Sequence, residues 1–332
     1  LSQLPINELD DGRDEDFGND IWTHHDMGGG GDGIGWLRFL RARVDPAGNR
    51  WFMGDQEALD VPGVIEFQIL SRDKNEWRQI SPATTGGAIW AGKTFDAAFG
   101  PNGVVYTATT LTGVQRWQTG GYDWASLSNL SNDVWSPIGR VGVEFSSEAN
   151  IEVLALSENG ILWIGTTAGL YKYNENLAPE FRFKHIPARQ GFNIGLLSAV
   201  VKDLVFDREG NLWVGTDKGL NRIAADNDND IAAYTTAAAF QSELHNIYDQ
   251  SVVSPLVNAF IETLVMHPTE DILYIGTRGG LTAFDITPEP PQPTDLNAVY
   301  VYPNPVYGRK GHTELKIGEI SGPCLLYTSD AA

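Results

Sequence analysis

Apolar residues recur along this chain in short alternating runs, separated by small groups of glycine and polar residues. The stretch 159–174, NGILWIGTTAGLYKYN, contains two such runs around the turn-forming letters GTTAG. A second stretch, GNLWVGTDKGLNRI, begins at Gly210 and keeps the same spacing. Short apolar runs between turn signals are typical of β-strands. The sequence therefore predicts a strand, a turn and a second strand in each stretch.

Five copies of this pattern occur along the chain. In the three clearest copies a Trp or Tyr is followed at fixed offsets by Gly-Thr and then by Gly-Leu. Neighbouring aromatic anchors are 50 to 61 residues apart. Such self-similarity indicates a repeat architecture. The repeat anchors are Trp51, Tyr106, Trp163, Gly165, Trp213, Gly215, Tyr274 and Gly276.

Each repeat predicts a small antiparallel sheet of four strands. An apolar segment such as IEVLALS precedes a turn such as SENG or DREGN, and the Asn, Asp and Gly residues of these turns favour tight reversals. Further strands are expected around Trp77, Trp135 and Phe183. Four strands per unit, repeated radially, indicate an all-β fold, a β-propeller of four-stranded blades. The recurrent tryptophans are then expected to pack between blades.

The repeats predict a ring with more blades than the five that can be counted. Residues 1–34 hold NDIWTH, which is similar to the segments around Trp77 and Trp135, and a glycine-rich loop. We interpret 1–34 as the remnant of a preceding blade and 35–287 as the propeller repeats. Five blades and a remnant fit part of a six- to eight-bladed ring better than a closed five-bladed one.

The repeat resembles that of a known family. NGILWIGTTAGLYKY, GNLWVGTDKGL and DILYIGTRGGL are similar to the two-component-regulator propeller repeat, whose core is G-N-L-W-I-G-T-x-x-G-L. The resemblance extends over 35–287 and is closest in three units. It implies either the periplasmic sensor half of a hybrid kinase or a secreted or surface protein of Bacteroidetes-like bacteria. The repeat alone names no ligand.

The composition of the chain changes after the last repeat. A proline-rich acidic linker occupies 288–297. The segment 298–324 resembles the start of the C-terminal sorting domain of type IX secretion cargo, which is a small β-sandwich. Its Pro-Asn-Pro motif has an ordinary turn as the alternative interpretation. Residues 325–332 resemble translated adapter sequence, so we expect a non-native tail there. The motif residues are Pro303, Asn304 and Pro305.

Charge and composition narrow the classes of partner. The formal net charge of −20 argues against binding nucleic acid or anionic membrane through bulk electrostatics, and it favours cationic partners. No run of eighteen apolar residues occurs, so no transmembrane segment is expected in this sequence. The single cysteine, Cys324, excludes an internal disulfide framework.

Candidate chemistry is sparse. Asp226, Asp228 and Asp230 alternate in DNDND as at the start of a calcium loop, but Ile231 stands where an EF-hand has glycine. A looser Ca²⁺ site and a solvated acidic loop are the alternatives, and no other cofactor is expected. No G-x-S-x-G motif occurs and no other catalytic constellation is visible, so we expect no enzymatic activity.

Aromatic residues in the long segments between blades are the candidate ligand-binding residues. Their rings have the shape to stack on sugar faces, and packing at blade edges is the alternative. They lie in 118–150 and 224–258, and they are Tyr122, Trp124, Tyr234 and Tyr248.

Three classes of function remain open, because propellers support all three. The first is a non-catalytic secreted or cell-surface propeller that binds a glycan, a lipopolysaccharide or proteins of the secretion machinery. The second is the periplasmic ligand-sensing half of a hybrid two-component regulator. The third is a polysaccharide-active enzyme. The resemblance of 298–324 to a sorting domain favours the first.

Overall fold

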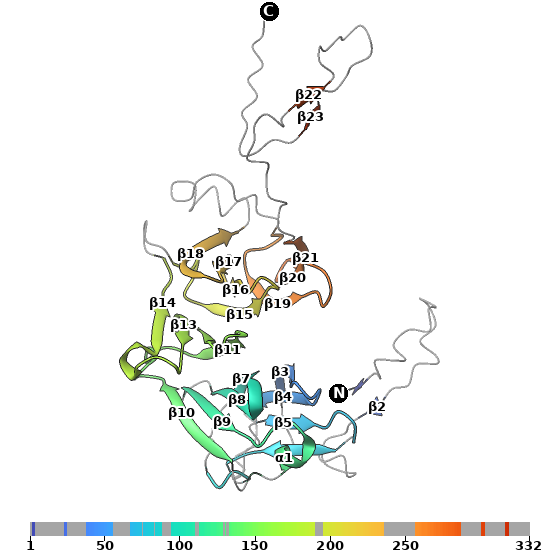
Figure 1. Cartoon of the computed structure of the whole chain (residues 1–332), viewed down its shortest axis with the longest axis vertical. Helices are drawn as coiled ribbons and strands as arrows, with labels where there is room; N and C mark the ends of the chain where they lie inside the picture. Colours follow the sequence, from blue (N-terminus) through green and yellow to red (C-terminus); the bar gives the residue numbers. More distant parts are fainter. Residues whose placement is uncertain are drawn as a thin grey trace, which may run out of the picture. The chain divides into compact units, whose positions relative to one another are not determined.

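Five antiparallel sheets follow one another along the described part of the chain in the computed structural model, as Figure 1 shows. The first four sheets have four strands each, and three strands of the fifth are described. Within each of these sheets, strands that are consecutive in sequence lie side by side. The structure describes residues 2–3, 23–24, 38–55, 67–74, 76–82, 84–87, 94–109, 113–128, 130, 133–189, 195–235, 256–286, 300–302 and 316–318.

We name the five sheets blades 1 to 5. Blade 1 contains β3 (Arg38–Val44), β4 (Arg50–Asp55), β5 (Phe67–Leu70) and β6 (Trp77–Ile80). Blade 2 contains β7 (Thr94–Phe99), β8 (Val104–Thr109), β9 (Gly113–Gln118) and β10 (Val134–Arg140), with helix α1 (Trp124–Ser128) before its last strand. Blade 3 contains β11 (Ile151–Leu156), β12 (Leu162–Thr166), β13 (Gly169–Tyr173) and β14 (Phe183–Ile186). Blade 4 contains β15 (Val201–Phe206), β16 (Leu212–Thr216), β17 (Gly219–Ala224) and β18 (Asn227–Tyr234), and blade 5 contains β19 (Ile261–Met266), β20 (Ile272–Thr277) and β21 (Gly280–Asp285).

The first strand of each blade lies at the centre of the array. Neighbouring blades contact one another from β3 to β7, from β7 to β11, from β11 to β15 and from β15 to β19. Blades joined in this way through their first strands form a β-propeller, so the predicted fold class is confirmed. The strands expected around Trp77, Trp135 and Phe183 are the fourth strands β6, β10 and β14.

The chain separates into two compact units, Leu1–Phe284 and Asp285–Ala332. Strand β1 (Ser2–Gln3) pairs with β2 (Thr23–His24) in the first unit, and β22 (Tyr300–Tyr302) pairs with β23 (Lys316–Gly318) in the second.

None of the described helices is long and apolar enough to cross a membrane. The segments outside the described residues include most of the predicted remnant 1–34, the linker 288–297, the motif Pro303, Asn304 and Pro305, and the tail 325–332.

In the turn between β3 and β4, an Asp carboxylate holds the aromatic anchor of the repeat. One oxygen of Asp45 accepts hydrogen bonds from the backbone N–H groups of Ala47 and Asn49, both at 2.9 Å. The other accepts from the Asn49 amide at 2.8 Å and from Trp51 Nε1 at 2.9 Å. Because Trp51 is fully buried, this carboxylate satisfies a donor that water does not reach. We name this arrangement the Asp–Asn–Trp clamp.

The clamp recurs in blade 4. Asp207 accepts from the backbone N–H groups of Glu209 at 3.1 Å and Asn211 at 2.8 Å. Its second oxygen accepts from the Asn211 amide and from Trp213 Nε1, both at 2.9 Å. Both clamps have the spacing D-x-x-G-N-x-W. In blades 1 and 4, Asp and Asn residues of the turn therefore hold the tryptophan that anchors the repeat.

The G-T-x-x-G part of the repeat forms the next turn. In blade 3 the Thr166 hydroxyl donates to the carbonyl oxygen of Gly169 at 2.8 Å, and Gly169 has a φ of 115°, which favours glycine. The preceding Gly165 serves packing. A Cβ at that position would lie 2.5 Å from Val153 and 2.6 Å from Val201, so glycine allows the first strands of blades 3 and 4 to approach.

A bulge interrupts the first strand of each blade at the equivalent place, and two of the residues that follow it join neighbouring blades. Asp96 in blade 2 accepts from the N–H of Leu154 in blade 3 at 2.9 Å. Asp203 in blade 4 accepts from the N–H of Leu264 in blade 5 at 2.8 Å. Arg41 lies 2.7 Å from Asp203, so an ion pair joins blade 1 directly to blade 4.

Candidate functional site

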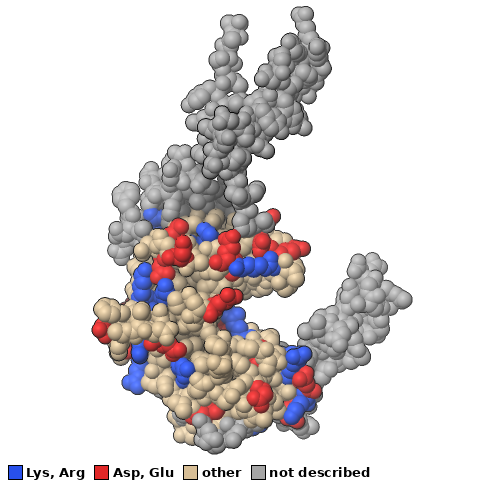
Figure 2. Space-filling model, in the orientation of Figure 1, with Lys and Arg blue, Asp and Glu red and all other residues tan. Residues whose placement is uncertain are grey.

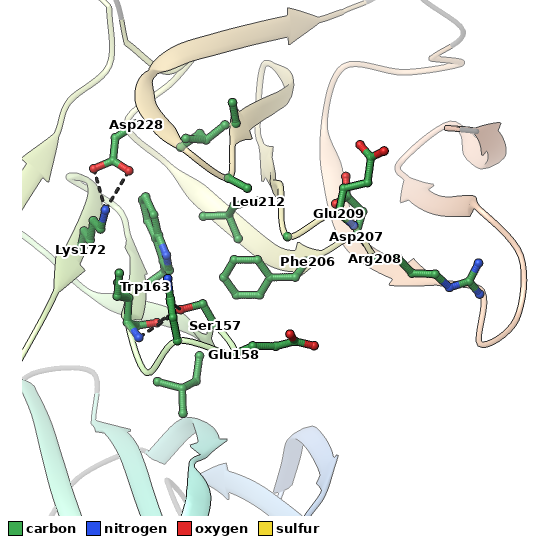
Figure 3. Close-up of a pocket in the computed structure, with 17 residues that line it drawn as sticks. Ser157, Glu158, Trp163, Lys172, Phe206, Asp207, Arg208, Glu209, Leu212 and Asp228 are labelled. Carbon is green, nitrogen blue, oxygen red and sulfur yellow. Dashed lines mark hydrogen bonds and ion pairs between the residues drawn. The ribbon is translucent and has the colours of Figure 1, made fainter. Parts of the chain in front are cut away.

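A pocket of about 380 Å³ lies between blades 3 and 4 (Figure 3). One side is the turn 157–160, which connects the first two strands of blade 3, and the other is the turn 207–210 of blade 4. Two aromatic residues, Trp163 and Phe206, line it together with polar and charged groups. Concave spaces that combine apolar rings with a few polar groups are the usual form of a ligand site.

An ion pair lies at the wall of the pocket. Both carboxylate oxygens of Asp228 lie 2.8 Å from Lys172 Nζ, and one lies 3.3 Å from Lys184 Nζ (Figure 3 shows the first pair). Burial alone would raise the pKa of Asp228, but the two ammonium groups outweigh it, so the pKa lies below its ordinary value of 3.8. Lys172 Nζ also stands over the Trp163 ring, 5.2 Å from its centroid.

The remaining charge at the pocket is negative. Glu158 and Glu209 are exposed on the two turns, and neither forms an ion pair within the described residues. Arg208, in the turn of blade 4, is paired with Asp271 of blade 5 at 2.8 Å. Lys172 is paired with Asp228, which it shares with Lys184 outside the pocket lining. Over the propeller as a whole, Figure 2 shows acidic and basic side chains interspersed on the visible face.

A second cavity, of about 400 Å³, lies where the ends of four first strands meet. Its lining is mostly apolar, and Phe206 belongs to both cavities. Its basic member, Arg43, donates to both oxygens of Asp96 at 2.8 Å. Burial alone would lower the pKa of Arg43, but Asp96 and the field of Asp203 outweigh it and raise the pKa. This arginine is therefore committed to the ion-pair network of the first strands.

The four aromatic residues singled out from the sequence do not meet in one site. The Tyr122 hydroxyl lies 2.7 Å from a backbone carbonyl oxygen of blade 2, and burial raises the pKa of Tyr122. Trp124 Nε1 donates to a glutamate of blade 1 at 2.6 Å. Tyr234 packs against Trp213 with ring centroids 5.6 Å apart, and Tyr248 lies outside the described residues. The contacts of the first three favour the alternative interpretation, packing at blade edges.

The three aspartates of DNDND differ in exposure and in their partners. Asp226 and Asp230 are exposed, whereas Asp228 lines the pocket and is held by the two lysines. No three His, Cys, Asp or Glu side chains in the described residues are grouped so that they could hold a metal ion. The structure therefore gives this segment a role in ion pairing at the pocket wall.

Sequence reasoning missed Lys172, Phe206 and the two glutamates, and it named Trp163 only as a packing residue. Trp163 is indeed 5% exposed, but it also lines the pocket. One signal was present in the sequence. The third repeat keeps the tryptophan but has SENGILW where the two other repeats with this tryptophan have D-x-x-G-N-x-W.

One segment of the chain, at the start of blade 4, matches a known family. Residues 195–218 match the model of the family described as Two component regulator propeller. The chain carries this propeller repeat. The matched residues include β15, β16 and the turn between them, so they include the second clamp. Histidine kinase P4 of Formosa agariphila is 37% identical over 70 residues, which is 21% of this chain and 5% of that protein.

Solved structures of two bacterial proteins are also similar. PorZ of Porphyromonas gingivalis, described as an essential surface component of the type-IX secretion system, has a TM-score of 0.56 and 21% identity over 87% of this chain and 38% of its own. The extracellular domain of the putative hybrid two component system BT4673 of B. thetaiotaomicron has a TM-score of 0.47 and 17% identity, over 73% of this chain and 27% of its own. The likeness to PorZ shows the propeller fold, and this chain spans less than half of the PorZ chain.

Proposed function

We propose that this chain is a non-catalytic binding propeller that holds a glycan in the pocket between blades 3 and 4. The observation that carries the proposal is the composition of that pocket. The half-buried ring of Phe206 lines it together with Ser157, Asn159 and Glu158, which carry a hydroxyl, an amide and a carboxylate group. A sugar presents apolar C–H faces and hydroxyl groups together, so it matches a lining that alternates an aromatic face with hydrogen-bonding groups.

We also propose that the propeller works outside the cytoplasm, secreted or at the outer-membrane surface. The resemblance of 298–324 to a type IX sorting domain supports this location, and so does the likeness of the propeller to a surface protein, PorZ. A PorZ-like role in a type IX secretion system, with lipopolysaccharide or secretion-machinery proteins as partners, is the fuller form of this proposal. The pocket is then where a glycan-bearing partner is recognised.

A second candidate function is the ligand-sensing half of a hybrid two-component regulator in the periplasm. The match of 195–218 to the two component regulator propeller, together with the similarity to histidine kinase P4, favours it. The same pocket would bind the sensed carbohydrate. The two candidates differ in what the native protein does after binding, because only the sensor changes phosphotransfer when ligand is added.

Calorimetric titration of the chain with short oligosaccharides tests the proposed site. Phe206→Ala removes the aromatic face, so we expect its affinity to fall about tenfold, which corresponds to about 1.4 kcal/mol. Phe181→Ala is the matched control, because Phe181 is 67% exposed and lines neither of the two cavities. Absence of binding by the unmodified chain, or equal affinity of the two variants, would overturn the proposed site.

A further inference from the structure

The tryptophan of blade 3 lacks the clamp that holds its counterparts in blades 1 and 4. Ser157 and Ile161 occupy the positions that are Asp and Asn in the other two clamps. The Ser157 hydroxyl is used locally, because it accepts from the Ile161 N–H and donates to the Ile161 carbonyl oxygen, both at 3.0 Å. In the described residues no acceptor is bonded to Trp163 Nε1, whereas Trp51 and Trp213 each donate to a carboxylate at 2.9 Å.

The free indole N–H of Trp163 belongs to a buried residue that borders the pocket. Only 5% of Trp163 is exposed, and the residue is part of the pocket lining. Its Nε1 is not fully enclosed, so the indole N–H of this pocket-lining residue keeps some accessible surface. Figure 3 shows the ring between Lys172 on one side and Ser157 on the other. A buried donor with access to a cavity and no partner in the protein is suited to a ligand acceptor.

The charges around this donor restrict the ligand. Lys172, whose ammonium group stands over the ring, is paired with Asp228, which Lys184 also contacts, and Arg208 is held by Asp271. Glu158 and Glu209 remain without ion pairs in the described part of the chain. A carboxylate or phosphate in this pocket would meet unbalanced negative charge, whereas a hydroxyl group could donate to either glutamate.

We infer that Trp163 Nε1 donates a hydrogen bond to an uncharged sugar residue in this pocket, and that loss of the clamp in blade 3 keeps that donor free. This inference rests on the proposed function and refines it. It names the ligand class as a neutral saccharide, with the Phe206 ring against its apolar face and the glutamates accepting from its hydroxyl groups. It also assigns a reason to the difference between the third repeat and the repeats of blades 1 and 4.

Restoring the clamp tests the inference. In the double variant S157D/I161N the new carboxylate should capture Trp163 Nε1 as Asp207 captures Trp213. We expect the urea midpoint of the double variant to rise and its affinity for short neutral galactan oligosaccharides to fall at least tenfold. Trp163→Phe removes the N–H by another route, so it should also weaken binding, and Phe181→Ala should not.

Nuclear magnetic resonance gives a direct measurement on the donor. The indole N–H signal of Trp163, assigned by its absence in Trp163→Phe, should shift when galactan oligosaccharides are added, and it should shift less with oligogalacturonate at equal concentration. Binding of galactan by the unmodified chain with an unchanged affinity in S157D/I161N would overturn this inference and leave the proposed function standing. Tighter binding of oligogalacturonate would also overturn it. Failure of the chain to bind any oligosaccharide would overturn both.

Discussion

Removal of the carboxylate from the blade 1 clamp tests whether the clamp stabilises the propeller. Asp45→Ala deletes an acceptor that is only 4% exposed and receives hydrogen bonds from Asn49 and Trp51. Three buried donors lose their partner: the backbone N–H of Asn49, one amide hydrogen of Asn49, and the Trp51 indole N–H. A buried donor left unsatisfied costs about 1–3 kcal/mol.

The expected loss in the free energy of unfolding is about 3–5 kcal/mol, since the three orphaned donors act together and the neighbouring turn relaxes in part. This is a large share of the roughly 5–15 kcal/mol that stabilises a typical domain. Urea unfolding followed by tryptophan fluorescence measures it. The midpoint should fall while the slope of free energy against urea stays the same, because the surface exposed on unfolding does not change.

Ser157→Ala is the matched control, because Ser157 occupies the equivalent position in blade 3 without holding its tryptophan. It removes the contacts of the Ser157 hydroxyl with Ile161 and Asn159, and we expect a loss of about 1 kcal/mol or less. The reasoning is refuted if Asp45→Ala costs no more than Ser157→Ala. In that case the tryptophans of the repeat would be held by packing alone.

Two further predictions concern the pocket wall and the contact between blades. Asp228→Asn should lower stability at neutral pH by about 1 kcal/mol by breaking the pair with Lys172. Because the pKa of Asp228 is lowered in the folded protein, this contribution to stability is lost as the pH falls below 3.8. The free energies of unfolding of variant and wild type, measured by urea titration, should therefore converge in acid. A difference that stays constant with pH would contradict the assignment. Gly165→Ala places a methyl group within 2.6 Å of Val153 and Val201. Thermal unfolding should therefore show a loss of about 1–3 kcal/mol in the free energy of unfolding. An unchanged melting temperature would contradict the packing argument.

The sequence determined the blade because the interactions inside a blade are local. Asp45, Asn49 and Trp51 span seven positions, and every bond of their clamp closes within one turn. The bond between Thr166 and Gly169 closes within four positions. Local contacts of this kind repeat whenever the letters repeat, so the strand order and the fourth strands follow from spacing alone.

The pocket could not be predicted in the same way, because its two sides come from different repeats. Phe206 and Trp163 belong to neighbouring blades, and Lys172 of β13 meets Asp228 of β18. Along the sequence, Asp228 has two aspartates as near neighbours, which suggested a calcium loop. In the folded protein its nearest charged neighbours are the ammonium groups of two lysines. The alternation of aspartates along one strand cannot reveal those contacts.

What the sequence determined by itself is therefore the unit: the meander of strands, its turns and the tryptophan between blades. What only the tertiary structure decided is which unit faces which, and at what distance. The ion pair of Arg41 in blade 1 with Asp203 in blade 4 and the pocket that Trp163 shares with Phe206 both depend on that arrangement. The physical reason is range: hydrogen bonds within a turn are fixed by neighbouring residues, whereas contacts between blades are fixed by the packing of distant strands around one axis.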